Sequence, residues 1–272
     1  MITILQNSHE YGMCCKKIAE SKRDRKILKR ILYNINFLKD TANELKPEIY
    51  EYKENELCYE AFEGETYNSI EADEIYNKEG WIVEKIIEKV GLLSKNQTLP
   101  EKEIIYRFYL LKRLMRGFKE TELCKAAIFK ALKDIIFDNK KYVLSHGDLT
   151  GWNIVIQYED KDIKIIDWEE LGGRPRYFDE MHLALHKVNN IYDLGWQKRL
   201  IKNIISKRKD KDHWKDYLRK MMILCTCLHI RNNARNTRNM KIRNKILMTR
   251  LSNIKILTDK KSYEQWIEWI SR

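Results

Sequence analysis

Four polar residues between His146 and Asp167 stand in an order that suits phosphoryl transfer: His146, Asp148, Asn153 and Asp167. Asparagine and aspartate supply hard oxygen ligands, the kind that Mg²⁺ prefers in proteins. If Asn153 and Asp167 serve a metal ion, Asp148 is left to orient and deprotonate a hydroxyl group. The chemistry that this order favours is therefore transfer of a phosphoryl group to an alcohol.

The elements around these residues must bring them together. An apolar run, Tyr142 to Leu144, enters the stretch, and residues 153–158 and 162–166 read as two strands joined by a turn at Glu159 to Lys161. Such a hairpin places Asn153 and Asp167 side by side, with Asp148 on the preceding loop. The alternative is an ordinary turn with Asp167 at a strand end, but ordinary turns do not usually supply three acceptor side chains at this spacing.

The stretch resembles the catalytic core of the kinase-like phosphotransferases that include the aminoglycoside phosphotransferases and choline kinases. Their pattern, H-x-D-x-x-x-x-N followed by two hydrophobic residues and D, is met by residues 146–153 and 165–167. Protein kinases have Arg where Gly147 stands, Asp-Phe-Gly where residues 167–169 read Asp-Trp-Glu, and an Ala-Pro-Glu motif that is absent here. The resemblance implies an α+β, protein kinase-like fold of two lobes, a small β-rich N-lobe and a large, mostly helical C-lobe.

The resemblance also implies roles. Asp167 holds the metal ion, Asn153 supplies a second metal contact, and Asp148 is the catalytic carboxylate. His146 is expected to brace the loop by hydrogen bonding rather than to act as a base. Glu169 reads equally as a carboxylate behind the metal site or on the substrate side, and as a salt bridge at the edge of the cleft.

A downstream aspartate of the family is matched by Asp179. In the family this residue ties the catalytic segment to the next helix, and its position also suits a helix N-cap. Asp179 is therefore expected to be structural.

The N-terminal residues match a shortened small lobe. Its expected elements are strands at 2–6 and 13–19, a helix at 21–38 with Ser21 as N-cap, and strands at 47–53 and 56–62. The acidic stretch at Gly64 resembles the family's hinge, which predicts domains 1–63 and 64–272. Backbone groups of Glu60, Ala61 and Phe62 would then bond the adenine of ATP or GTP, with Ile166 also at the nucleotide.

Two lysines on the second strand are candidates for gripping phosphate, Lys16 and Lys17. Side chains alternate on a strand, so only one enters the cleft, and Lys17 is favoured because it precedes an apolar pair as the family lysine does. The chain departs from the family in two respects. The helix at 22–38 has no glutamate to pair with this lysine, so Glu20 or Asp24 substitutes or the pair is absent, and residues 7–12 hold a single glycine.

The rest of the chain reads as mostly helical, with apolar residues three and four apart. Pro100 fits the first turn of one of these helices. The expected helices span 70–93, 101–115, 120–137, 178–189, 196–206 and 214–229, with further helix out to Trp269.

Composition bounds the class of protein. Hydrophobic residues make up 43% of 272 residues, and three prolines and ten glycines argue against disorder and against a turn-rich all-β fold. No secretory signal or transmembrane segment is apparent, and six cysteines without a disulfide framework favour a reducing, cytoplasmic location. Cys225, Cys227 and His229 could be metal ligands, but a buried helix face is the better reading.

The formal net charge is +12, and residues 217–258 contain no acidic residue. This basic block is either a solvated helix surface or a site for an anion. Binding to nucleic acid or a membrane surface ranks last, because no module that reads a nucleic acid is evident. The basic residues of the block are Arg219, Lys220, Arg231, Arg235, Arg238, Lys241, Arg243, Lys245, Arg250 and Lys255.

These observations predict an ATP-dependent, Mg²⁺-requiring kinase that phosphorylates a hydroxyl group of a small molecule. If the basic block lines the cleft, the acceptor is an anionic sugar, a polyol or a glycan precursor. The alternative is a degenerate kinase-like protein that binds a nucleotide or sugar without turnover. The sequence leaves the acceptor and the oligomeric state open.

Overall fold

A computed structural model describes most of the chain. The residues described are 1–8, 12–67, 80–95, 110–112, 114–115, 122–138, 142–186, 191–195, 197–206, 211–236 and 240–272. The side chains of residues 122–125, 211–213, 231–236 and 240–247 are not among them. The chain divides into two compact units, which are taken in turn: Met1–Thr98 with Leu144–Gly172, and Leu99–Val143 with Gly173–Arg272.

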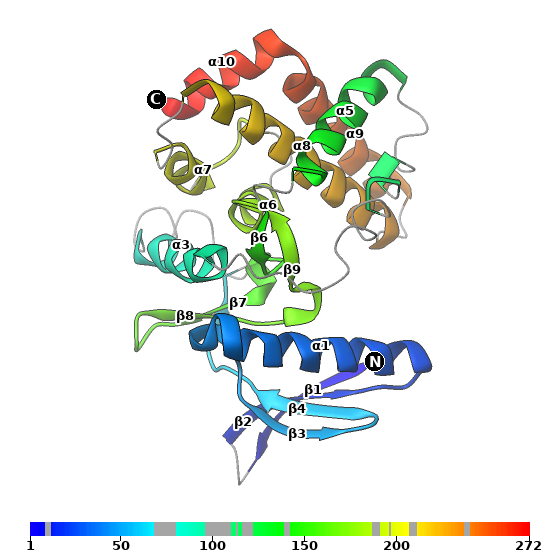
Figure 1. The fold of residues 1–272 in the computed structure, drawn as a ribbon, viewed down its shortest axis with the longest axis vertical. Coiled ribbons are helices and arrows are strands. Elements are labelled where there is room, and N and C mark those ends of the chain that lie inside the picture. The colour runs from blue at the N-terminus through cyan, green and yellow to red at the C-terminus, as the bar shows by residue number, and fades with distance from the viewer. Residues whose placement is uncertain are drawn as a thin grey trace. The chain divides into compact units, whose positions relative to one another are not determined.

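The first unit contains a four-stranded antiparallel sheet in the order β1-β2-β4-β3. Helix α1 (Lys22–Thr41) lies along this sheet (Figure 1). The Ser21 side chain caps α1 by accepting a hydrogen bond from the Asp24 N–H at 3.1 Å. The helix buries one face, which includes a polar residue, Asn34. The strands are β1 (Ile2–Ser8), β2 (Gly12–Ile18), β3 (Ile49–Lys53) and β4 (Glu56–Glu60).

A second sheet of the same unit has the order β5-β7-β8. It joins the two-residue strand β5 (Glu65–Thr66) to a hairpin of β7 (Ile154–Gln157) and β8 (Asp162–Ile165). Helix α3 (Gly80–Lys95) is linked to β8 by an ion pair of 3.3 Å between Lys89 and Asp162. Strands β6 (Tyr142–Ser145) and β9 (Gly172–Pro175) form a separate two-stranded sheet.

The second unit is built from helices. Within it α8 packs against α5, α6 and α9, and α10 packs against α7 and α9. Polar groups anchor its buried aromatic residues: the Trp266 indole N–H donates to the Ile191 carbonyl at 2.9 Å. The helices are α5 (Glu122–Ile136), α6 (Phe178–His186), α7 (Gln197–Ser206), α8 (Lys211–Asn236), α9 (Met240–Thr258) and α10 (Lys260–Ser271).

The predicted N-terminal elements are confirmed with shifted ends. The strands predicted at 2–6 and 13–19 both extend further toward the turn between them, to Ser8 and from Gly12. Helix α1 continues to Thr41. Asn153 lies in a short 3₁₀ turn, Gly151–Asn153, instead of beginning the strand that follows. Of the helix predicted at 70–93 the structure describes Gly80 onward; Pro100 and most of the helix predicted at 101–115 lie outside the described residues.

The cysteines of α8 form part of the core. Cys225 and Cys227 are fully buried, and burial raises the pKa of the Cys225 thiol. His229 is also buried, and its Nε2 lies 3.1 Å from Nδ1 of His182. Burial lowers the pKa of His229. Among the described residues no three His, Cys, Asp or Glu side chains are arranged to hold a metal ion. In the same part of the chain, no helix combines the length and the apolar character that crossing a membrane requires.

Candidate active site

The predicted hairpin brings Asn153 and Asp167 to one end of the β7–β8 pair. Ile154 pairs with Ile165, so Asn153 faces Ile166 across the end of the hairpin. The Ile166 N–H donates to the Asn153 carbonyl at 3.0 Å and closes this end. Asp167 follows directly. Residues 14 positions apart in the chain therefore meet at one point through the ladder of hydrogen bonds.

Asn153 also holds the loop that contains Asp148. Its side-chain amide N–H donates to the Asp148 carbonyl at 2.9 Å, and the residue is 9% exposed. Because the NH₂ group is directed at the loop, the side-chain oxygen Oδ1 is left to ligate or accept. One side chain thus fixes the backbone of Asp148 and presents a hard oxygen.

His146 contacts backbone groups on both sides of its ring. Its ring is fully buried, with Nε2 2.9 Å from the Ile166 carbonyl and Nδ1 3.3 Å from the Asp148 N–H. A carbonyl must receive a proton and an N–H must give one, so these contacts assign the proton to Nε2. Both nitrogens are used inside the protein, and the geometry is that of a support.

Asp167 has a backbone conformation that residues other than glycine seldom adopt. Its φ of 64° and ψ of 59° lie in the left-handed region, which costs a residue with a Cβ about 1–2 kcal/mol. The side chain is 40% exposed, and its Oδ1 lies 2.8 Å from the ammonium nitrogen of Lys17. This ion pair joins β2 of the first sheet to the end of the hairpin.

The two candidate lysines lie on opposite faces of β2. Lys17 is buried and points at Asp167, whereas the Lys16 ammonium lies 2.8 Å from Glu56 on β4. The hydrogen bond to Glu56 raises the pKa of Lys16. Neither Glu20 nor Asp24 substitutes for the helix glutamate, since both contact the amino group of Met1. The partner of Lys17 is the predicted metal ligand itself.

At the predicted hinge, two of the backbone N–H groups already donate hydrogen bonds within the protein. The Glu60 N–H donates to the Glu48 carbonyl at 2.8 Å, and the Ala61 N–H to the Met13 carbonyl at 3.2 Å. The Phe62 N–H has no acceptor among the residues that the structure describes. Gly64 follows at a φ of 144°, beside the backbone of Ile156. Of the three predicted residues, Phe62 therefore offers the donor that an adenine edge needs.

The segment after Asp167 is tied to α1. The Arg30 guanidinium lies 2.5 Å from Glu169 and 3.4 Å from Glu170. Burial raises the pKa of the Glu169 carboxyl, and Arg30 acts in the opposite direction. The Asn34 amide donates to the carbonyls of Trp168 and Glu169 at 2.7 and 3.2 Å. No role was predicted from the sequence for Arg30 or Asn34.

The two tryptophans beside the predicted metal ligands differ in exposure. Trp168 is buried and packs at a tilt against His146, with ring centroids 4.8 Å apart and an interplanar angle of 59°. Trp152 is 55% exposed. Asp179 lies buried in the first turn of α6, where a carboxylate stabilises the start of a helix.

Several members of the basic block already have partners within the second unit. Lys220 pairs with Asp134 and Asp216 at 2.9 and 2.7 Å, and Arg219 pairs with Asp216 at 2.6 Å. Arg250 is buried and donates to the His186 carbonyl, and burial lowers its pKa to about 10. The side chains from Arg231 to Lys245 lie outside the description. The described members do not form a surface of unpaired positive charge.

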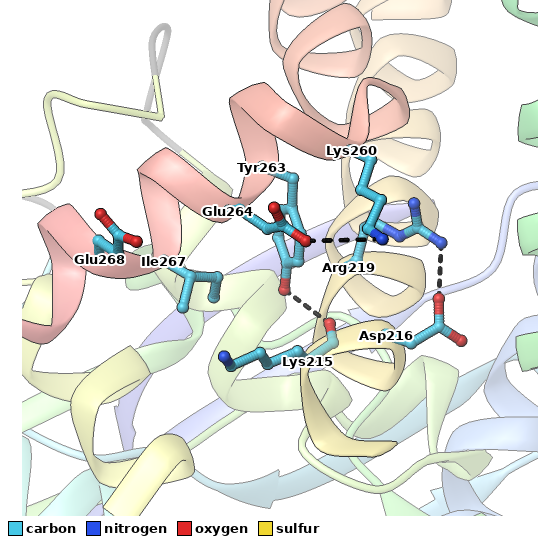
Figure 2. Close-up of a pocket in the computed structure, with 8 residues that line it drawn as sticks. All are labelled: Lys215, Asp216, Arg219, Lys260, Tyr263, Glu264, Ile267 and Glu268. Carbon is cyan, nitrogen blue, oxygen red and sulfur yellow. Dashed lines mark hydrogen bonds and ion pairs between the residues drawn. The ribbon is translucent and has the colours of Figure 1, made fainter. Parts of the chain in front are cut away.

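A hollow of about 410 Å³ between α8 and α10 is lined by one member of the block, Arg219 (Figure 2). The Tyr263 hydroxyl crosses it to donate to the Lys215 carbonyl at 2.7 Å. Three basic and three acidic side chains line it, so its charge does not select an anion. Its residues are Lys215, Asp216, Arg219, Lys260, Tyr263, Glu264, Ile267 and Glu268.

The residues at the end of the hairpin suit a magnesium ion and a nucleotide. Asn153 Oδ1 and the Asp167 carboxylate are hard oxygen donors. Asp167 already holds one cation, the Lys17 ammonium, at 2.8 Å. A part-exposed carboxylate next to a buried ammonium offers an oxygen ligand to a metal ion and a charged donor to phosphate oxygens.

Comparison with solved structures confirms the fold. The chain matches kinase-like small-molecule phosphotransferases over nearly its whole length. A choline/ethanolamine kinase family protein from Mesorhizobium loti is 10% identical with a TM-score of 0.61, over 95% of this chain and 86% of that one. A choline kinase from Streptococcus pneumoniae is 13% identical with a TM-score of 0.61, over 93% and 89%.

An aminoglycoside phosphotransferase from Streptomyces rimosus, solved with ADP and streptomycin, is 16% identical with a TM-score of 0.57. The match covers 82% of this chain and 92% of that one. No protein-family profile matches the sequence, and no curated protein does. The mixed α+β architecture, an N-terminal antiparallel sheet and a helical C-terminal part, is thus a kinase-like fold recognised through structure.

Proposed function

We propose that the protein is an ATP-dependent phosphotransferase that phosphorylates a hydroxyl group of a small molecule. The observation that carries this proposal is the meeting of Asp148, Asn153 and Asp167 at one loop and hairpin end, with Lys17 paired to Asp167. The kinase-like fold adds support, because structures solved with ADP share it.

Each residue has a task in such a reaction. Asp167 and Asn153 would hold a magnesium ion, which when bound neutralises the charge of the phosphates. Lys17 would hold phosphate oxygens, and Asp148 would orient the acceptor hydroxyl and take its proton. His146 keeps the loop in place through its two ring nitrogens. The Phe62 N–H would bond the base of the nucleotide.

The acceptor is proposed only as a class. Structures of this fold include proteins described as an ethanolamine kinase, an aminoglycoside phosphotransferase and a choline kinase. Choline, ethanolamine and aminoglycosides are cations at neutral pH. The basic block suggested an anionic acceptor instead, but of its described members Arg219 and Lys220 are paired and Arg250 is buried, which leaves Lys255 exposed. An alcohol of either charge therefore belongs in the test.

The test combines nucleotide binding with turnover. We expect ATP or ADP to raise the temperature of unfolding more in the presence of Mg²⁺ than with EDTA, because ligands that bind the folded state stabilise it. Production of ADP should then rise with one member of a panel of choline, ethanolamine, aminoglycosides, sugars and sugar phosphates.

The outcomes separate the candidates. Metal-dependent stabilisation together with acceptor-dependent ADP release supports a kinase. Stabilisation with no ADP release across the panel favours a protein that binds nucleotide without turnover. Absence of any response to nucleotide contradicts the proposal.

The two lysines of β2 provide a matched pair. Lys17→Ala should raise the KM for ATP by about 10-fold or more, because charge-assisted hydrogen bonds to phosphate are lost. Lys16→Ala removes an equal charge from the opposite face and should leave KM within about 2-fold, since exposed ion pairs contribute little. Steady-state kinetics measure both. Equal effects of the two substitutions would contradict the assignment of Lys17.

A further inference from the structure

Asp167 has its strained backbone because both of its neighbours are fixed. On one side, the Ile166 N–H is bound to Asn153 and its carbonyl lies 2.9 Å from the His146 ring. On the other side, the buried Trp168 donates its indole N–H to the Ile165 carbonyl at 3.1 Å. A left-handed residue persists only when its surroundings determine it.

Helix α1 provides further contacts on the side of Trp168. Arg30 and Asn34 are four residues apart and lie on one face of the helix. Asn34, 3% exposed, donates to the carbonyls of Trp168 and Glu169 at 2.7 and 3.2 Å. Arg30 pairs with the Glu169 side chain at 2.5 Å. The short turn Trp168–Glu170 is therefore held through its backbone and its carboxylates.

We propose that Arg30 and Asn34 are positioning residues that hold Asp167 in the conformation in which it binds the metal ion. This inference rests on the proposed function. It also accounts for the absence of a glutamate on α1. The helix contacts the segment after Asp167 through Arg30 and Asn34, while Lys17 pairs with Asp167 directly. In this chain the helix would position the metal ligand Asp167 instead of pairing with Lys17.

The test compares magnesium dependence among variants of α1. Arg30→Ala should raise the Mg²⁺ concentration for half-maximal activity by about 3–5-fold, the range that a part-exposed ion pair can supply. The KM for ATP at saturating Mg²⁺ should stay within about 2-fold, because Lys17 is untouched. The control is Lys29→Ala, which removes an exposed charge from the neighbouring position of α1 and should match the unaltered protein.

A charge exchange and a binding measurement distinguish positioning from loss of stability. Arg30→Glu alone should be worse than Arg30→Ala, because it faces two carboxylates, and adding Glu169→Arg should restore Mg²⁺ dependence. Calorimetric titration with ADP should show weakened affinity in Arg30→Ala with Mg²⁺ and unchanged affinity with EDTA. Asn34→Asp, which keeps the size but loses the donor, should show the same pattern more strongly.

Failures of the two proposals look different. If the unaltered protein binds ADP with Mg²⁺ but Arg30→Ala and Asn34→Asp show its Mg²⁺ dependence unchanged, the role of α1 is refuted and the proposed function stands. A fall in ADP affinity of equal size with Mg²⁺ and with EDTA also refutes positioning. If the unaltered protein does not respond to Mg²⁺ and nucleotide, both proposals fall.

Discussion

Asp148→Asn should reduce turnover by about 10²–10⁴-fold, the range associated with loss of a general base. Binding of Mg²⁺–ATP should stay within about 3-fold, because the substitution keeps the size of the side chain and removes only its charge. The structure explains why the loop should survive. Asp148 is held through its backbone, whose N–H contacts His146 at 3.3 Å and whose carbonyl accepts from Asn153 at 2.9 Å.

The measurement is the rate of ADP production with the acceptor found in the panel, together with ADP affinity by calorimetry. Asp160→Asn is the matched control, since it removes an exposed carboxylate from the turn of the same hairpin. It should behave as the unaltered protein does. Near-normal turnover by Asp148→Asn would show that another group takes the proton of the acceptor.

Gly64→Ala should lower the free energy of unfolding by about 2–4 kcal/mol, since two separate costs act at this position. The φ of 144° belongs to a region that is open essentially to glycine alone. A Cβ at Gly64 would also lie 2.2 Å from the Ile156 carbonyl oxygen, which is backbone and cannot turn aside. The expected fall in the midpoint of thermal unfolding is about 5–15 °C.

Gly91 is the control for this substitution. It lies within α3, and a Cβ added there meets no atom within 4 Å. Gly91→Ala should be neutral or stabilise the protein by up to about 1 kcal/mol, because alanine favours a helix. Equal midpoints of thermal unfolding for the two variants would mean that the backbone around Gly64 shifts to accommodate the added methyl group.

The parts of this protein that local patterns determine were predictable. Apolar spacing and the Ser21 cap located α1, and the alternation on either side of residues 159–161 located the hairpin. The hairpin register then placed Asn153 against Ile166. These features depend on residues close in sequence, where periodicity and turn chemistry carry the information.

Partners that are distant in sequence were not predictable in the same way. Alternation on β2 required that one lysine face inward, but nothing local says that Lys17 meets Asp167, 150 residues away. Asn34 gave a weak signal, because it interrupts the apolar stripe of α1 between Ile31 and Ile35. A buried amide in such a stripe must find acceptors. Arg30 gave none, since an arginine on an exposed face is ordinary.

The lobe boundary predicted at residue 63 stays a prediction.

The basic block shows that the net charge of a sequence segment does not predict an exposed charged surface. A run without acidic residues suggested a site for an anion. Lys220 nevertheless pairs with two acidic residues outside the run, Asp134 on α5 and Asp216 on α8. Arg250 is buried against a carbonyl. Net charge along a sequence does not reveal which charges face water.

The first compact unit is assembled from two separated pieces of chain, Met1–Thr98 and Leu144–Gly172. Among the residues that the structure describes, strand β5 pairs with β7, which belongs to the second piece. During synthesis the ribosome must therefore pass residue 172 before the N-terminal residues can complete their fold. Until then the edge at β5 is exposed to other nascent chains, and a slow stretch of translation across residues 99–143 would prolong that exposure.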